Sequence, residues 1–165
     1  MKIYVTGLGV VSGIGIGVSE NIEALRQRKH GIGKVTLFPT ALDVPVSEVK
    51  RSNEELKQLI SLPPQRTVSR TALLGMIAAK EAMKDAGLTP PLRIGFISAT
   101  SVGGMDLSEH FYESFKKNPG QGRLREVISH DCGASTELIA SYLGINDFIT
   151  VSYTHLRAHE TGRNL

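Results

Sequence analysis

The stretch YVTGLGVVSGIGIG, residues 4–17, decides how the chain begins to fold. Residues 2–6 are predicted to form a strand, because β-branched and aromatic residues there precede the first glycine. A stretch so rich in glycine does not favour a helix, so we expect the first helix to begin only near Ser19, with Ser19 as its N-cap. The five glycines of the stretch are Gly7, Gly9, Gly13, Gly15 and Gly17.

A glycine-rich turn after a strand is also the phosphate-binding element of dinucleotide-binding domains. That fingerprint, G-x-G-x-x-G, opens a helix at once and is followed by an acid about 20 residues later. Gly7 and Gly9 match its first two positions, but Ser12 takes the third. The later glycines stand where the helix should already run, and each would cost that helix about 1 kcal/mol. We therefore interpret the glycines as carrying the backbone through a tight, buried turn, with no cofactor; a dinucleotide-binding oxidoreductase domain is the alternative.

Composition restricts the class of protein. The 165 residues are 41% hydrophobic and 21% charged, which is typical of a soluble domain with a core of its own. The net charge of +3 is small and scattered, so no nucleic-acid partner is expected. A single cysteine excludes an internal disulfide framework and favours a reducing, cytoplasmic compartment. No apolar run reaches the ~18 residues that a membrane-spanning helix needs.

Strands and helices alternate along the chain. Short apolar runs predict strands over 93–98 and 148–152, the first apolar on both faces as in a covered parallel sheet. Helices are expected over 53–60, 66–86 and 106–117, and from an N-cap at Ser135 to Leu143, while 31–53 reads as a loop with at most one short strand. The 66–86 helix carries a wide apolar stripe, so its middle should be buried. This order predicts an α/β layer structure with a mainly parallel sheet.

Four segments, taken together, resemble the N-terminal end of β-ketoacyl-ACP synthases, the condensing enzymes of fatty-acid and polyketide synthesis. The resemblance covers roughly residues 1–150 and implies part of the first half of a thiolase-like α-β-α-β-α layered sandwich, in which the opening glycines bind no nucleotide. Residues 1–150 are thus expected to form an incomplete synthase N-terminal domain. The segments are VTGLGVVSGIGIG (5–17), RTALLGMIAAKEAMKDAGL (70–88), RIGFISATSVGG (93–104) and ASTELIASYLGI (134–145).

The resemblance also implies an activity. The family joins an acyl group to a malonyl unit by decarboxylative Claisen condensation, without metal or organic cofactor. Its substrates are carried by acyl carrier protein on phosphopantetheine, and the enzymes form homodimers or heterodimers. A cysteine on a strand-to-helix elbow takes the acyl chain as a thioester. Two histidines, or a histidine and an asparagine, then promote decarboxylation and stabilise the oxyanion.

The end of the sequence departs from the family. No cysteine follows the strand over 148–152, and residues 151–165 resemble no part of the family, so we expect an unrelated tail, artefactual or disordered. This chain is therefore expected to lack the catalytic cysteine and histidines and to be inactive. His155 and His159 stand four apart with Glu160 adjacent, but no acid lies between them as in H-E-x-x-H, so no metal site is predicted.

Some binding roles carry over from the family by position. Val102, with Gly103 and Gly104, falls where elongating synthases line the acyl pocket near the dimer interface. Arg66 falls where the family presents a basic residue to the acidic carrier protein, and Arg123 and Arg125 are expected near the same patch. A non-catalytic carrier-docking module, for which Arg66 is the lead, is a second alternative.

Cys132 follows His130 and Asp131 and precedes a predicted helix, which raises the question of a substitute nucleophile. Residues one and two apart in sequence rarely meet productively, and no clear strand leads into Cys132. We therefore predict a semi-buried structural cysteine. His30 and His110 are expected at the surface or at helix ends.

Overall fold

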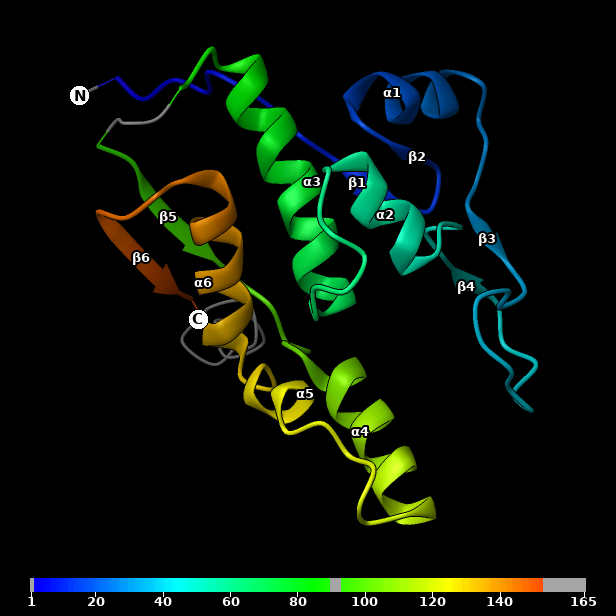
Figure 1. The fold of residues 1–165 in the computed structure, drawn as a ribbon. Coiled ribbons are helices and arrows are strands. Elements are labelled where there is room, and N and C mark those ends of the chain that lie inside the picture. The colour runs from blue at the N-terminus through cyan, green and yellow to red at the C-terminus, as the bar shows by residue number, and fades with distance from the viewer. Residues whose placement is uncertain (1, 90–92, 153–165) are drawn as a thin grey trace, which may run out of the picture. The chain divides into compact units, whose positions relative to one another are not determined.

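The computed structural model describes residues 2–89 and 93–152. The chain divides into two compact units. The first comprises the residues up to Pro64 together with Met76–Thr89, and the second comprises Gln65–Gly75 together with the residues from Pro90 onward. The boundary falls inside the longest described helix, α3 (Arg70–Asp85), which Figure 1 shows in green. Each unit is described by itself.

In the first unit, the N-terminal segment lies directly on α3. A Cβ atom added to Gly9 would lie 1.9 Å from the carbonyl oxygen of Ala78, and one added to Gly7 would lie 2.3 Å from that of Ala82. The two glycines are therefore needed for close approach to the helix backbone. The strand predicted over 2–6 is wrong, because no described strand pairs with this segment; instead the Leu8 N–H donates to Asp85 at 2.9 Å.

The remaining glycines form a hairpin organised by a buried asparagine. Strands β1 (Val11–Ser12) and β2 (Gly15–Ile16) pair antiparallel. Asn21 is 7% exposed, and its Nδ2 donates to the carbonyl oxygens of Gly15 at 2.9 Å and Gly17 at 2.8 Å. Its Oδ1 accepts from the Ser12 hydroxyl, so the whole amide group is satisfied. The predicted tight turn is confirmed, although it is half-buried rather than buried.

Helix α1 (Val18–Arg26) begins beyond all five glycines, as the rejection of the dinucleotide fingerprint requires. The predicted N-cap Ser19 is wrong, because Gly17 occupies that position with φ 94° and contributes no side chain. The first N–H group of the helix, that of Val18, donates to the Glu81 side chain at 2.8 Å. A carboxylate from α3 therefore replaces the local cap that the sequence pattern predicted.

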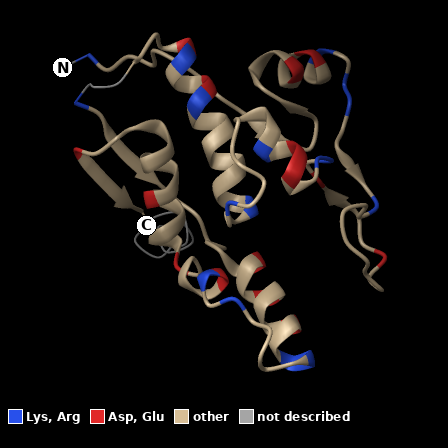
Figure 2. Cartoon of the chain, viewed as in Figure 1, with Lys and Arg blue, Asp and Glu red and all other residues tan. Residues whose placement is uncertain are grey.

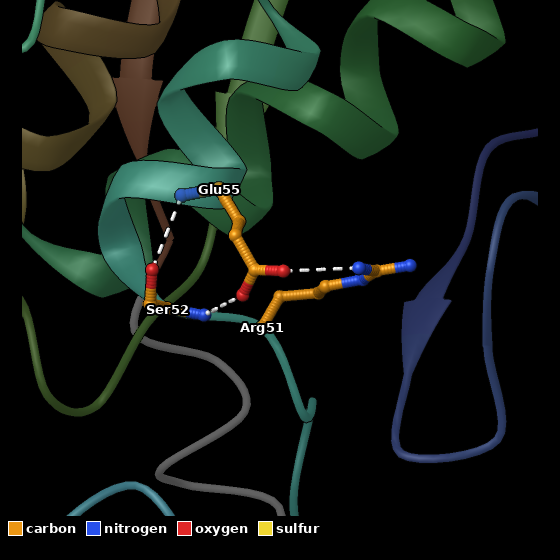
Figure 3. A network of polar contacts seen from close by, with 3 residues as sticks. All are labelled: Arg51, Ser52 and Glu55. Carbon is orange, nitrogen blue, oxygen red and sulfur yellow. Dashed lines mark hydrogen bonds and ion pairs between the residues drawn. The ribbon is translucent and has the colours of Figure 1, made fainter.

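The prediction of at most one short strand over 31–53 is wrong, because two short strands form there and pair antiparallel, β3 (Ile32–Gly33) and β4 (Val46–Ser47). Helix α2 (Asn53–Leu59) follows, as predicted, and begins with a capping box, drawn in Figure 3. The Ser52 hydroxyl accepts the Glu55 N–H at 3.2 Å, and the Glu55 carboxylate accepts the Ser52 N–H at 2.7 Å and contacts Arg51 at 3.0 Å. The bond from the Ser52 N–H, and then Arg51, lower the pKa of Glu55.

The second unit contains the predicted parallel strand pair. Strands β5 (Gly95–Ser98) and β6 (Phe148–Val151) run parallel in register from Gly95 opposite Phe148 to Ser98 opposite Val151. Helix α6 (Cys132–Leu143) packs on this pair (Figure 1). The predicted coverage of β5 on both faces is wrong, because Ile97 is 64% exposed.

Helix packing supplies the core of both units. Leu56 is fully buried in the first unit, and Ala72 and Leu73 are fully buried in the second. Gly75 brings α3 close to α6, because a Cβ added there would lie 2.6 Å from the Cδ1 atom of Ile139. The predicted burial of the middle of α3 is confirmed.

Two helix starts differ from the sequence prediction, and one short helix was not predicted. Helix α3 begins at Arg70 rather than residue 66, with the Ser69 hydroxyl accepting the Ala72 N–H at 3.2 Å. Helix α6 begins at Cys132 rather than after Ser135, which is 1% exposed inside the helix. Between α4 (Met105–Lys117) and α6 lies a short helix, α5 (Arg125–Ile128), that no period revealed, because four residues carry too little pattern.

Candidate functional site

The candidate pocket residues form the turn that leads from β5 into α4. The Thr100 hydroxyl accepts the N–H groups of both Val102 and Gly103, each at 3.2 Å, and closes the turn locally. Gly103 has φ 56°, which favours glycine. The Met105 N–H donates to the Val102 carbonyl at 3.2 Å, so α4 begins directly from the turn.

One side of this turn presses against the residues that precede α6. The Gly104 N–H donates to the His130 carbonyl at 3.2 Å. A Cβ added to Gly104 would lie 1.9 Å from the carbonyl oxygen of Ser129, and one added to Gly103 would lie 2.6 Å from that of His130. The glycine pair is therefore required by close backbone approach, beyond the general need of a turn.

The other side of the turn is tied to the start of α3. Asp106, in the first turn of α4, accepts the backbone N–H of Arg70 through Oδ2 at 2.7 Å. Arg70 is the first residue of α3, so its N–H has no partner inside the helix. The second carboxylate oxygen of Asp106, Oδ1, is buried and has no hydrogen-bond partner among the described residues. The sequence analysis missed this link; its only signal was an acid at the start of the predicted 106–117 helix.

The predicted binding residues lie near the starts of α3, α4 and α5. Val102 is 47% exposed and lies beside the buried Gly103 and Gly104. Arg66 is exposed just before α3, and Arg123 and Arg125 are exposed around the start of α5. Figure 2 shows basic residues at the C-terminal end of α4 and around α5. Among the described residues, no side-chain hydrogen bond or ion pair joins these three arginines to one another or to another residue. Their membership of one patch stays a prediction.

Cys132 is half-buried at the first position of α6, as predicted for a structural cysteine. The His130 ring nitrogen Nδ1 lies 2.9 Å from the Ser108 hydroxyl, so that ring is engaged by α4. His30 and His110 are exposed, as expected, and His110 lies 3.4 Å from Glu126 of α5.

Potential metal ligands do not gather into a site in the described part of the chain. Within 2–89 and 93–152, no group of three or more His, Cys, Asp or Glu side chains is arranged to hold a metal ion. His155, His159 and Glu160 lie outside those ranges.

Most of the chain matches a family model. Residues 1–146 match the family model described as "Beta-ketoacyl synthase, N-terminal domain". The parallel strand pair, the helix packed on it and the glycine-lined start of the chain therefore belong to a thiolase-like α/β fold, of which this chain forms part of the first half. The chain belongs to the β-ketoacyl synthase family.

The curated relatives include a nodulation protein and a 3-oxoacyl-[acyl-carrier-protein] synthase. Nodulation protein E of Rhizobium meliloti is 30% identical over 153 residues, which are 87% of this chain and 37% of that protein. The 3-oxoacyl-[acyl-carrier-protein] synthase 2 of Coxiella burnetii is 30% identical over 122 residues, 68% of this chain and 28% of that protein. The chain thus spans about a third of the length of the curated relatives it matches.

Solved structures show the same relationship. The ishigamide ketosynthase/chain length factor is 26% identical and superposes with a TM-score of 0.75 over 89% of this chain and 38% of that chain. A type II polyketide ketosynthase in complex with its acyl-carrier protein shares the fold, with a TM-score of 0.65 and 23% identity over 89% of this chain and 36% of that chain. Within the described residues, no helix is both long and apolar enough to cross a membrane.

Proposed function

We propose that this chain is the N-terminal part of a β-ketoacyl-ACP synthase that condenses an acyl thioester with malonyl-ACP by decarboxylative Claisen chemistry. The match to the β-ketoacyl synthase N-terminal domain over residues 1–146 carries the proposal. Relatives named for synthesis on acyl carrier protein and for polyketide synthesis support it. Residues 1–150 supply the first part of the fold in this proposal. Residues 151–165 are proposed to be a tail unrelated to the synthase, except that Val151 completes β6 opposite Ser98.

The catalytic cysteine and histidines lie outside this sequence in the proposed enzyme. Cys132 is the single cysteine of the 165 residues, and it lies at the start of α6, ahead of β6. The family places its nucleophile after the strand that corresponds to β6. The 165-residue polypeptide is therefore proposed to be inactive by itself. A cytoplasmic location is also proposed, because a single cysteine is typical of a reducing compartment.

The turn over Val102–Gly104 is proposed to line the acyl pocket. It lies at the carboxyl end of β5, the edge of a parallel sheet at which α/β folds bind ligands. Val102 keeps 47% of its surface exposed, so it is available to contact an acyl chain. The full synthase is proposed to act as a homodimer or heterodimer, as the ketosynthase/chain length factor pair among the structural neighbours suggests.

Carrier docking is assigned to Arg66, with Arg123 and Arg125. These three side chains are exposed and make no ion pair with a described residue, so their charges are available to an acidic partner. The same observation favours a second candidate function, a carrier-docking module without catalysis. Both candidates require that an acyl-carrier protein binds this chain.

Titration of the 165-residue chain with malonyl- and acyl-loaded carrier protein tests this proposal. We expect saturable binding that weakens with added salt and falls about tenfold in Arg66→Glu, as for one charge reversal at a steered interface. Lys34→Glu is the matched control, because Lys34 is an exposed cation of the first unit that pairs with Asp43 at 3.5 Å. The absence of carrier binding to the wild-type chain, or equal losses in the two variants, would contradict the docking assignment.

A further inference from the structure

Two polar side-chain contacts join α4 to residues 126–130, and each of them contains a histidine. Helices α4 and α5 lie side by side (Figure 1), and Nδ1 of His110 on α4 lies 3.4 Å from Oε2 of Glu126 on α5. Two residues before His110, the Ser108 hydroxyl lies 2.9 Å from Nδ1 of His130. These two contacts together are called the α4–α5 clasp. Histidine is the side chain that gains its charge between pH 8 and pH 5, so the clasp contains groups that respond to pH.

The two partners of the first contact differ in burial. The Glu126 side chain is 13% exposed, whereas the His110 side chain is 67% exposed. A carboxylate that has lost most of its water is stabilised more by a cation than by a neutral ring. A neutral imidazole at this separation offers at most one long hydrogen bond, whereas a protonated imidazole adds an ion pair. Protonation of His110 should therefore fasten α5 to α4.

The other charges on the two helices leave the His110 ring in an acidic setting. Residues three or four apart share one face of a helix, which puts Asp106 and Glu113 beside His110 on α4. Glu113 contacts Lys117, one turn beyond, at 2.6 Å. Arg125 on α5 is exposed, so water and salt screen its repulsion of a protonated ring. The charged residues of the two helices outside the clasp are Asp106, Glu109, Glu113, Lys116, Lys117 and Arg125.

We propose that the α4–α5 clasp is a pH-sensitive device, closed by protonation of His110, that fixes the carrier-docking residues Arg123 and Arg125. The proposal rests on the proposed function, in which these two arginines meet the acidic carrier protein. Arg125 directly precedes Glu126, and the Glu126 N–H donates to the Arg123 carbonyl at 2.9 Å, so a fixed Glu126 fixes both. Cations that are already ordered lose less entropy on binding than mobile ones, so the closed clasp should bind the carrier more tightly.

The clasp is closed within a window of pH. Histidine side chains ordinarily become charged below about pH 6.5, and glutamate side chains ordinarily stay charged down to about pH 4.3. Between these values the two partners of the first contact carry opposite charges. Above the window an ordinary histidine is neutral, so the ion pair is lost as the pH rises, while the contact between Ser108 and His130 remains.

Amide hydrogen exchange of the 165-residue chain at about pH 5.5 and about pH 7.5 tests the clasp without any partner. Each rate is divided by that of an unstructured peptide at the same pH, because exchange itself depends on pH. The informative amides are Val127 and Ile128, whose N–H groups donate to the Leu124 carbonyl at 3.0 and 3.3 Å. We expect about threefold more protection at the lower pH, as for one partly exposed ion pair. His110→Gln and Glu126→Gln should each remove this difference.

A matched control separates the clasp from a general effect of pH. His30→Gln also removes one exposed histidine, in the first unit, and it should keep the full difference at Val127 and Ile128. The amide of the buried Ile139 in α6 should show no such difference. A difference at Val127 and Ile128 that survives in His110→Gln would overturn the proposal. An equal difference at Ile139 would mean that the whole unit responds to pH, and it would also overturn the proposal.

Carrier binding at the same two pH values tests the regulatory role. The ratio of the affinity at the lower pH to that at the higher pH should be about two- to threefold larger in the wild type than in His110→Gln. His30→Gln loses the same ionisable group and should keep the wild-type ratio, whereas equal ratios in the wild type and His110→Gln would overturn the regulatory role. If the wild-type chain binds no carrier at either pH, the proposed docking function fails and the regulatory role falls with it. Exchange at Val127 and Ile128 then still decides whether the clasp responds to pH.

Discussion

The Glu81 carboxylate of α3 accepts the backbone N–H of Val18 through Oε1 at 2.8 Å and so caps α1 from a position 63 residues away in sequence. Its other oxygen, Oε2, accepts the Val10 N–H at 3.0 Å. One side chain therefore fixes both the N-terminal segment and the helix that follows the glycine turn. The glycines permit the close approach, and Glu81 supplies the bonds that hold it.

Removal of that carboxylate should destabilise the first unit. We expect Glu81→Ala to lower the free energy of unfolding by about 2 kcal/mol, because the half-buried Val18 N–H and the exposed Val10 N–H both lose a charged acceptor. Glu81→Gln should lose less, since its amide oxygen still accepts one of the two N–H groups. Urea titration measures the free energy of unfolding of both variants. Lys84→Ala is the control, because Lys84 is exposed on the same helix, and it should stay within about 0.5 kcal/mol of the wild type. Equal losses in Glu81→Ala and Lys84→Ala would contradict this role.

The close approach of the N-terminal segment to α3 should not tolerate a methyl group. Gly9→Ala would place a Cβ atom 1.9 Å from the Ala78 carbonyl oxygen, so the segment must move away from the helix. We expect a loss of about 1–3 kcal/mol in the free energy of unfolding, with faster amide exchange at Leu8 and Val10. Gly33→Ala is the control, because a Cβ there would meet nothing within 4 Å. An unchanged free energy of unfolding in Gly9→Ala would show that the segment does not lie on α3 in solution.

The capping box of α2 should make the stability of that helix depend on pH. The Ser52 N–H, and then Arg51, lower the pKa of Glu55 from its usual 4.5 in the folded chain. A lowered pKa means that the stabilisation is present above the usual value and is lost as the pH falls through the folded value. Helicity over 53–59 should therefore decline on acidification below 4.5, followed by circular dichroism or by residue-specific amide signals. Glu55→Gln should show a flatter profile, and an identical profile would argue against the capping box.

The 165-residue chain should not condense acyl and malonyl groups. Cys132 begins α6, ahead of β6, whereas the proposed enzyme carries its nucleophile after that strand. We expect no ketoacyl product above the no-enzyme rate from acyl- and malonyl-loaded carrier protein, in the wild type and in Cys132→Ala alike. Turnover that Cys132→Ala abolishes would make Cys132 the nucleophile and would overturn the proposed location of the catalytic residues.

Much of this architecture could be predicted from local pattern. The stripe of α3, the helix that became α2 and the parallel strands over Gly95–Ser98 and Phe148–Val151 follow from residue types and spacing. The glycine turn was recognised, but the cap of α1 was not, because a preference for Ser19 is local whereas Glu81 acts from another helix.

The candidate turn shows the same limit of sequence reasoning. Gly103 and Gly104 were identified through a family resemblance, while the reason for them, the backbone of residues 129–132, is a tertiary contact. Asp106 resembled any acid in the first turn of a helix, and its bond to Arg70 was invisible in the sequence, since the two residues lie 36 apart.

The central claim is that this chain begins a β-ketoacyl-ACP synthase, and the most direct test is to sequence the source DNA from the codons of β6 through and well beyond codon 165. The account predicts that the reading frame continues after Phe148–Val151 into a cysteine at a strand-to-helix elbow, with the catalytic histidines further along. Codons for Tyr153 to Leu165 followed at once by a stop codon would contradict it. The gene would then encode a chain without the condensing machinery, and carrier binding would be the only proposed function left.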